Sequence, residues 1–290
     1  LVHIWTWIYI AGLLAAFFAP LAGVMINAID LIPAVRLMYL FAFVLMTAKA
    51  WVLYRYSTET HQGRIRMEAT RGQALFSLLR GYGSVFKRVL KTPRTLVALG
   101  LTAIGSIYLM ITNTFWSIIV TEVHGIPAEH IAIYPFARSV LLLLLYFILV
   151  PRLNVRRFRN PMLIGYAGYI TAQIILVTMP AGNYWLLLLS VLIEAFSMAI
   201  FRPLVDSLVV LSIDKDERAR INAILAVIAL SLASPFGWIA GQLSEINRIL
   251  PFILNMGLLL IGSILVVLAW RLSNPKDSGV IRSDHPPALK

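Results

Sequence analysis

The chain has 290 residues, of which 60% are hydrophobic and 13% are charged, and it carries a formal net charge of +12 with no cysteine. Charged residues make up about a quarter of an ordinary soluble domain, so this composition excludes one and indicates a protein whose solvent is mostly lipid. The absence of cysteine excludes disulfide frameworks, thiolate nucleophiles and cysteine-based zinc sites.

The apolar residues fall in runs of about 20, the length that an α-helix needs to cross a hydrocarbon core of about 30 Å. The run from Ser139 to Val150 includes five consecutive leucines, and it lacks the alternation of a transmembrane strand. We therefore predict an all-α integral membrane protein with eight transmembrane helices. The expected spans are 4–28, 35–54, 95–120, 131–150, 161–180, 184–211, 221–243 and 250–270.

The basic residues lie in alternate loops. Of the 25 Lys and Arg, nine lie in 55–94, four in 152–159, three in 215–220 and four from 271 onward, which makes 20 on one side of the predicted topology. By the positive-inside rule this side faces the cytoplasm. We expect a multi-pass protein of the plasma (cytoplasmic) membrane with both termini in the cytoplasm.

The loop 56–94 is the only long connection between predicted spans. Apolar residues recur in it at helical spacing, with basic residues between them, which predicts an amphipathic helix on the inner leaflet. A solvated linker is the alternative interpretation. The apolar positions are Leu75, Leu79, Tyr82, Phe86 and Val89.

The first and seventh predicted helices share a pattern of proline and small residues. Ala19-Pro20-Leu21-Ala22-Gly23 in one corresponds to Ser234-Pro235-Phe236-Gly237-Trp238-Ile239-Ala240-Gly241 in the other. The prolines lie six helices apart, which favours a repeated six-helix unit. We interpret five residues as helix-kink and packing positions: Pro20, Gly23, Pro235, Gly237 and Gly241.

The segment from Asp214 to Ala223, running into Ser234–Gly241, resembles the loop between the tenth and eleventh helices, and the eleventh helix itself, of the major facilitator superfamily of secondary transporters. Gly12–Gly23 is similar to the fifth helix of that family. Pro151–Arg157 is similar to the basic loop between its eighth and ninth helices. The resemblance covers nearly the whole chain, as the last eight of twelve helices.

This resemblance implies a domain organisation. Residues 1–55 are expected to be the last two helices of an N-terminal lobe, 56–94 a basic cytoplasmic linker, 95–272 a complete six-helix C-terminal lobe and 273–290 a cytoplasmic tail. Four further helices of the same protein are expected to precede Leu1 and to act as its partner. Alternating access by rocking requires both lobes.

Charged residues inside spans need a physical reason, because each costs about 2.5–3.5 kcal/mol at a helix centre on insertion scales. Lys49 lies near the end of its span, so its stem can reach the inner headgroups. Arg202 and Asp206 are four residues apart around Pro203, so they can pair on one helix face. We interpret this pair as a cytoplasmic gate, with a purely structural pair as the alternative.

Glu194 is predicted near the membrane midplane, because it lies ten residues into its span. A carboxyl group at that depth can couple transport to protons, by ionising in one access state and accepting a proton in the other. Arg138 lies behind Pro135, about a third of the way across its span, and is the nearest candidate cation by depth; it can bind substrate or pair with Glu194. Structural packing of either residue is the alternative.

Asn113 and Trp116 place a polar group beside an aromatic ring, which suits a substrate cavity; helix–helix hydrogen bonding is the alternative. We predict proton-coupled secondary transport of a small organic solute by alternating access, with an efflux carrier favoured. The alternatives are a membrane scaffold or sensor and, least favoured, a membrane-embedded enzyme. The partners expected are a small-molecule substrate and the lipid bilayer. No cofactor, metal or nucleic acid is expected.

Overall fold

The computed structural model describes residues 12, 19–59, 63–64, 67–68, 92–131, 133–153, 158–211 and 218–273. These residues form helices and short connections, and no strand occurs among them. The elements are α2 (Ala19–Ile29), α3 (Leu31–Tyr56), α6 (Pro93–Ile118), the π-helix η1 (Ile119–Val123), α7 (Ala128–Ile131), α8 (Ile133–Ile148), the 3-10 helix η2 (Val150–Arg152), α9 (Arg159–Thr178), α10 (Tyr184–Leu211), α11 (Arg218–Ile246) and α12 (Leu250–Ser273). The amphipathic helix predicted around residues 75–89 lies outside the described residues.

Seven helices in the described part of the chain are long and apolar enough to cross a membrane. They correspond to the second to eighth predicted spans, and the prediction of an all-α membrane protein is confirmed. The first predicted span, 4–28, lies mostly outside the described residues. Several helices extend beyond the predicted apolar runs; α11, for example, covers 218–246 where 221–243 was predicted. Backbone hydrogen bonding continues past the point where a side-chain pattern becomes polar, which explains the difference.

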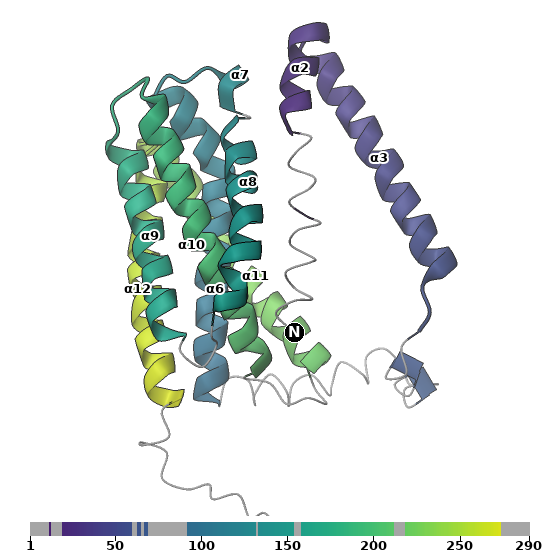
Figure 1. The fold of residues 1–290 in the computed structure, drawn as a ribbon, viewed down its shortest axis with the longest axis vertical. Coiled ribbons are helices and arrows are strands. Elements are labelled where there is room, and N and C mark those ends of the chain that lie inside the picture. Colours follow the sequence, from purple (N-terminus) through teal and green to yellow (C-terminus); the bar gives the residue numbers. More distant parts are fainter. Residues whose placement is uncertain are drawn as a thin grey trace, which may run out of the picture.

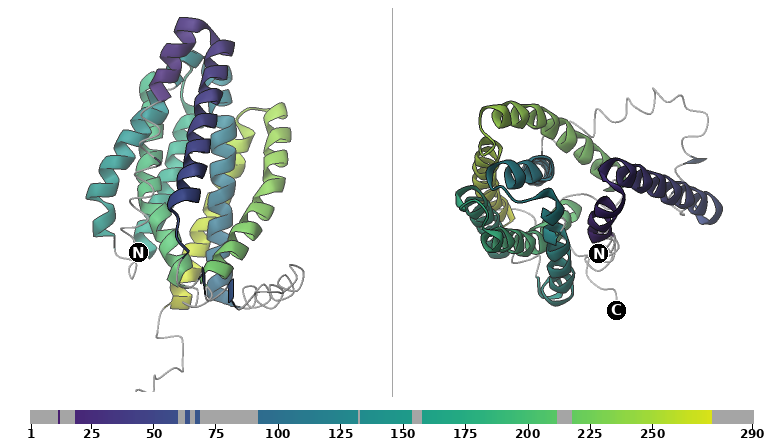
Figure 2. Two further views of the ribbon diagram at one scale, coloured as in Figure 1. Left: turned by 90° about the vertical axis from the view of Figure 1, so that its right-hand side faces the viewer. Right: turned by 90° about the horizontal axis from the view of Figure 1, so that it is seen from above.

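Helix α6 lies at the centre of the bundle. It contacts α10, α11 and α12, and the most extensive contact between two helices is that of α9 with α10 (Figures 1 and 2). In the most apolar stretch of the α6 span 56% of the residues are buried inside the protein, whereas in that of α3 none is. Polar side chains on α6 therefore face other helices more than lipid, and they are the ones to inspect for a site.

Small residues bring α9 and α10 together. A Cβ at Gly165 would lie 3.5 Å from the backbone oxygen of Ser197, so the two helices approach closely there. The hydroxyl of Ser190 donates a hydrogen bond of 2.7 Å to the backbone oxygen of Ala172, across the same interface. Close backbone approach and interhelical hydrogen bonds are the usual means of helix association in lipid, where the hydrophobic effect between helices is absent.

Helices α2 and α3 form a hairpin beside this bundle. Asp30 joins them with φ of 67°, in the left-handed region, and α2 contacts α8 (Figure 1). Helix α3 carries large apolar side chains on every face, and they are exposed, as are Lys49 and most of its other side chains. A helix apolar all round requires an apolar environment.

One end of the bundle is basic. Helices α6 and α9 begin there and α12 ends there, at the lower end of Figure 1. The guanidinium of Arg159 lies over the ring of Trp270, 4.2 Å from its centroid, and joins α9 to α12. We refer to this as the basic end, and to the other as the opposite end.

The proline and glycine residues singled out from the sequence lie within helices. Pro20 and Gly23 fall in α2, and Pro235 lies inside α11 without ending it. A Cβ at Gly237 would lie 3.3 Å from Sδ of Met110, so this glycine lies where α11 packs on α6, whereas Gly241 has nothing within 4 Å. Gly237 therefore lies at a close contact between two helices, where a packing role is expected.

Candidate functional site

Four residues predicted as site residues line one cavity. Asn113 and Trp116 come from α6, Arg138 from α8 and Glu194 from α10, and the cavity has a volume of about 140 Å³. We call it the Glu194 cavity. Its other lining residues are Thr112, Ser117, Pro135 and Val191.

Helical spacing explains why these side chains share the cavity. Residues three or four apart lie on the same helix face, as do Asn113 and Trp116 on α6, and Val191 and Glu194 on α10. The ring of Trp116 packs edge-on against that of Tyr134, with 6.1 Å between centroids, so the indole is held in place by α8. Three helices thus contribute polar or aromatic groups to one small space, as ligand sites do.

The carboxylate of Glu194 lies between partners from two other helices. Its Oε1 accepts a hydrogen bond of 2.8 Å from the hydroxyl of Tyr108, and its Oε2 lies 4.0 Å from Nη1 of Arg138. Glu194 is buried, and Arg138 is about one-third exposed. A buried carboxylate persists only with such hydrogen bonds or counter-charges, since an isolated one is very costly.

Tyr108 is a site residue that the sequence interpretation missed. It is buried on α6, and its ring packs on that of Tyr169 from α9, with 4.6 Å between centroids. The available signal was Thr112, one helical turn further along α6 than Tyr108, since this spacing places the two hydroxyls on one helix face. Nothing in the sequence indicates that this face meets Glu194, 86 residues away.

A second cavity, of about 120 Å³, lies among α6, α9, α10 and α12. Arg202 and Asp206, predicted as a gate, both line it, and we call it the Arg202 cavity. Its lining residues are Leu101, Thr102, Ile104, Gly105, Ser106, Tyr108, Leu109, Tyr166, Tyr169, Met198, Phe201, Arg202, Val205, Asp206 and Leu259. The structure thus separates the two predicted groups, with Arg138 and Glu194 in one cavity and Arg202 and Asp206 in the other.

The two cavities occupy successive lengths of the bundle. On α6 the Arg202 cavity is lined by residues 101–109, nearer the basic end, and the Glu194 cavity by residues 112–117. On α10 the same order holds in reverse, with 198–206 lining the first and 191–194 the second. Tyr108 lines one cavity and Glu194 the other, so their hydrogen bond lies between the two.

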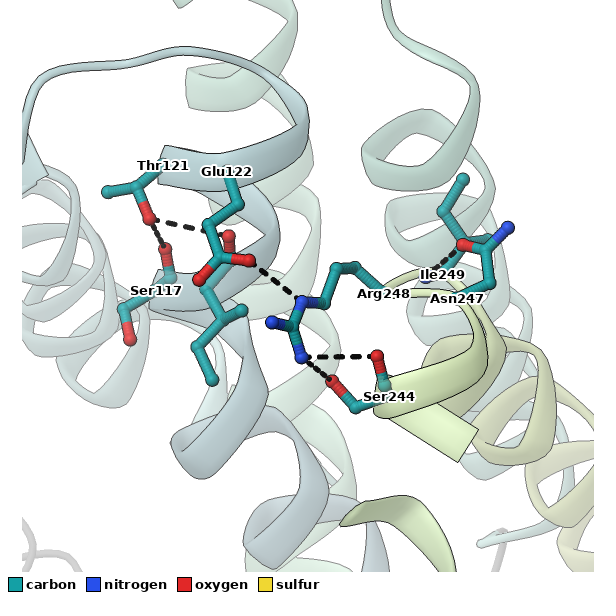
Figure 3. Close-up of polar contacts among 8 residues, drawn as sticks. Ser117, Thr121, Glu122, Ser244, Asn247, Arg248 and Ile249 are labelled. Carbon is teal, nitrogen blue, oxygen red and sulfur yellow. Dashed lines mark hydrogen bonds and ion pairs between the residues drawn. The ribbon is translucent and has the colours of Figure 1, made fainter. Parts of the chain in front are cut away.

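Another polar group at the opposite end was also missed. Nε of Arg248 donates a hydrogen bond of 2.8 Å to Oε2 of Glu122, and its Nη1 donates to the backbone oxygen and the hydroxyl of Ser244, each at 3.1 Å (Figure 3). These contacts join η1, at the end of α6, to the turn between α11 and α12. Arg248 and Glu122 are about half-exposed, Ser244 is buried, and none of the three lines either cavity, which suits a structural tie.

Within the described part of the chain, no group of three or more His, Asp or Glu side chains is arranged to hold a metal ion. The polar groups that line the two cavities are hydroxyl, amide, indole, carboxylate and guanidinium groups. Such groups can bind a solute, exchange a proton or form ion pairs.

A bundle of helices long and apolar enough to cross a membrane, with cavities between them, suits a membrane transport protein. The model of the Major Facilitator Superfamily matches residues 4–238, which is most of the chain, and the chain belongs to this superfamily. The resemblance seen in the sequence is therefore confirmed, and the protein is a multi-pass membrane protein of a transporter family rather than of an enzyme family. A search of curated proteins and a search of solved structures each found no match.

Proposed function

We propose that the protein carries out proton-coupled secondary transport of a small organic solute by alternating access, in the efflux direction, with Glu194 as the proton-carrying group. The observation that carries this proposal is the position of the Glu194 carboxylate. It is buried at the wall of a cavity, with Tyr108 and Arg138 as its partners. Asn113 and Trp116, which line the same cavity from α6, are the proposed substrate contacts.

The chemistry follows from what protonation does to this carboxylate. Ionised, it is an acceptor for Tyr108 and a counter-charge for Arg138; protonated, it loses its attraction for the guanidinium. Arg138 is then available to an anionic or polar group of the substrate. Binding of substrate and binding of the proton thereby affect one another, which is the thermodynamic requirement for coupling.

We also propose how the chain is organised in the membrane. Residues 95–272 form a six-helix C-terminal lobe, 1–55 supply two helices of an N-terminal lobe, and the linker 56–94 and tail 273–290 are cytoplasmic, in the plasma membrane. The exposure of α3 on all its faces supports an arrangement in which further helices of an N-terminal lobe pack beside it. Arg202 and Asp206, near the basic end, are the proposed cytoplasmic gate.

Transport in proteoliposomes tests the assignment of Glu194, in the complete protein and with solutes identified by screening. Glu194→Gln is expected to abolish accumulation driven by a pH gradient and to leave solute exchange largely intact, because exchange does not require the proton to cycle. Arg138→Ala is expected to weaken solute binding instead. Glu245→Gln, at an exposed carboxylate near the end of α11, is the matched control and should change neither.

Unchanged pH-driven accumulation in Glu194→Gln would overturn the proton-carrying role and favour a uniporter or a sodium-coupled carrier. Loss of both exchange and accumulation in a folded Glu194→Gln protein would instead place Glu194 among the substrate contacts.

A further inference from the structure

The contact between Tyr108 and Glu194 separates two cavities that follow one another along the bundle, each with some polar side chains in its lining. The hydroxyl of Tyr108 donates to Oε1 of Glu194 at 2.8 Å, and both side chains are buried. Tyr108 lines the Arg202 cavity, toward the basic end, while Glu194 lines the Glu194 cavity, toward the opposite end. A proton on Glu194 therefore has one hydroxyl between it and the second cavity.

We propose that Tyr108 is a proton relay that connects Glu194 to the Arg202 cavity, and that this cavity is the proton path to the cytoplasmic side. The proposal rests on the proposed proton-carrying role of Glu194. It goes beyond that role because it gives protons a path of their own inside the bundle. This path runs through the Arg202 cavity, whereas the solute is assigned to the Glu194 cavity.

The transfer is balanced without any additional reactant. The protonated carboxyl of Glu194 gives its proton to the phenol oxygen of Tyr108 while the phenol gives its own proton to a water in the Arg202 cavity. Tyr108 stays neutral throughout. Its hydroxyl rotates toward this water before the transfer, and the proton that it then receives from Glu194 restores the starting hydrogen bond to the carboxylate. Glu194 is left as a carboxylate, and the proton leaves as hydrated proton on the side of the Arg202 cavity.

The Arg202 cavity has the size and the polar groups that water requires. One water needs about 10–15 Å³ of such space and two to four polar partners. The cavity has about 120 Å³, which is room for several waters. Polar side chains provide partners along its length, with Ser106 and Tyr169 near Tyr108 and Thr102, Arg202 and Asp206 nearer the basic end.

The ionisable groups around the path come from several helices. Around Glu194 they are Tyr108 of α6, Arg138 of α8 and Tyr169 of α9, which lies within electrostatic reach of the carboxylate. Around Asp206 they are Arg202, on the same helix, and Tyr146 of α8. Arg138 approaches the other carboxylate oxygen, Oε2, and lines the Glu194 cavity but not the Arg202 cavity, so it is not among the residues along the proposed path.

The experiment follows protonation of Glu194 directly, without a transported solute. The chain is reconstituted in one orientation in proteoliposomes, and the carboxyl C=O infrared band is recorded after a rapid pH jump on the side of the basic end. The band is assigned by its loss in Glu194→Gln. Tyr108→Phe is expected to slow its response at least tenfold and to leave the response to a jump on the opposite side unchanged.

Tyr166→Phe is the matched control. Tyr166 is another buried tyrosine of the Arg202 cavity, and its hydroxyl has no hydrogen-bond partner among the described residues. Its removal should leave the rate unchanged. An equal slowing in both variants, or no slowing in Tyr108→Phe, would overturn the relay.

A second measurement is independent of the Tyr108 variant. Ser106→Cys should react with a charged, water-soluble thiol reagent added on the side of the basic end, because Ser106 lines the cavity. Ser190→Cys, buried between α9 and α10, should not. Failure of Ser106→Cys to react would show a dry cavity and overturn the path. A Glu194 band that never changes with pH would instead overturn the proposed proton-carrying role itself, before the relay is considered.

Discussion

Arg248 and Glu122 join two segments that are 126 residues apart, through a hydrogen-bonded ion pair of 2.8 Å between Nε and Oε2. Both side chains are more than one-third exposed, and Arg248 also donates to Ser244. The pair closes the opposite end of the bundle, between η1 and the turn that follows α11 (Figure 3). The pair joins distant segments, but solvent reaches both side chains and weakens their attraction.

We predict that this ion pair contributes about 1 kcal/mol or less to stability, because exposed pairs are screened by solvent and salt. A double-mutant cycle with Glu122→Gln and Arg248→Gln, followed by thermal unfolding in detergent, should give a small coupling that decreases as salt is added. Glu129→Gln, at another exposed carboxylate of that end, is the control. A coupling of several kcal/mol that is insensitive to salt would contradict the prediction.

His124 should make stability depend on pH. It directly follows the α6–η1 span, and burial lowers the pKa of its imidazole below the usual value of 6.5, although a hydrogen bond to the Leu176 backbone acts in the opposite direction. The unfolded chain therefore binds more protons than the folded chain just below pH 6.5. The stabilising contribution is fully present above that pH, and it is lost as the pH falls toward the lowered folded-state pKa.

Thermal unfolding between about pH 5 and pH 8 measures this effect, because histidine titrates in that range. His124→Gln should flatten the decrease in melting temperature on the acid side, whereas His130→Gln, close by in α7, should keep it. The same acid-side decrease in His124→Gln as in the parent protein would refute the assignment.

Gly262 should be intolerant of even a methyl group. A Cβ there would lie 2.5 Å from the hydroxyl oxygen of Tyr166 and 2.6 Å from Cε1 and Cζ of its ring. Gly262→Ala is therefore expected to destabilise the α9–α12 contact by about 1–3 kcal/mol, as overpacking of a core does.

Gly257 provides the matched control on the same helix, because nothing lies within 4 Å of the position of its Cβ. Gly257→Ala should be neutral or slightly stabilising, since alanine is the better helix former by about 1 kcal/mol. The two variants are compared by thermal unfolding in the same detergent. Equal melting temperatures would show that Tyr166 moves aside at little cost.

The proposed topology predicts which loops react with a membrane-impermeant thiol reagent. The absence of native cysteine allows single cysteines to be read without background. Cysteine at Glu59 or Gly63 should be labelled only from the cytoplasmic side, and cysteine at Ala181 or Asn247 only from the outside. Ala181 is chosen instead of Gly182, because the φ of 74° at Gly182 would strain any side chain placed there. Labelling of Gly63 and Asn247 from one side would overturn the arrangement of spans.

The transmembrane helices could be predicted well because lipid imposes a single, simple pattern on sequence. The predicted span 184–211 coincides with α10, although Pro203 lies inside it. Proline is tolerated there because neighbouring groups can satisfy the freed backbone. Hydropathy could not predict which helices, or which faces of a helix, are buried inside the protein. Helices α3 and α6 are both apolar, yet α3 is exposed and α6 is central.

The sequence predicted most residues of the candidate site, but it did not predict which of them contact one another. Glu194 and Arg138 were selected as charged groups at depth in apolar spans, and the structure brings them to 4.0 Å. Tyr108 was not predicted, because a tyrosine in an apolar span does not indicate a site until its hydrogen-bond partner is known. Depth follows from counting residues, whereas lateral contact depends on helix rotation, which is set by packing that no local pattern encodes.

The arrangement of two cavities around one hydrogen bond has an electrical consequence. Water in each cavity would extend the conductive medium into the protein from both sides, so the membrane voltage would fall mainly across the short stretch between Tyr108 and Glu194. A unit charge crossing a full 100 mV exchanges about 2.3 kcal/mol with the field. The 2.8 Å between Tyr108 and Glu194 is a small part of the membrane thickness. A proton that moves over this distance would nevertheless exchange a much larger part of that energy with the field.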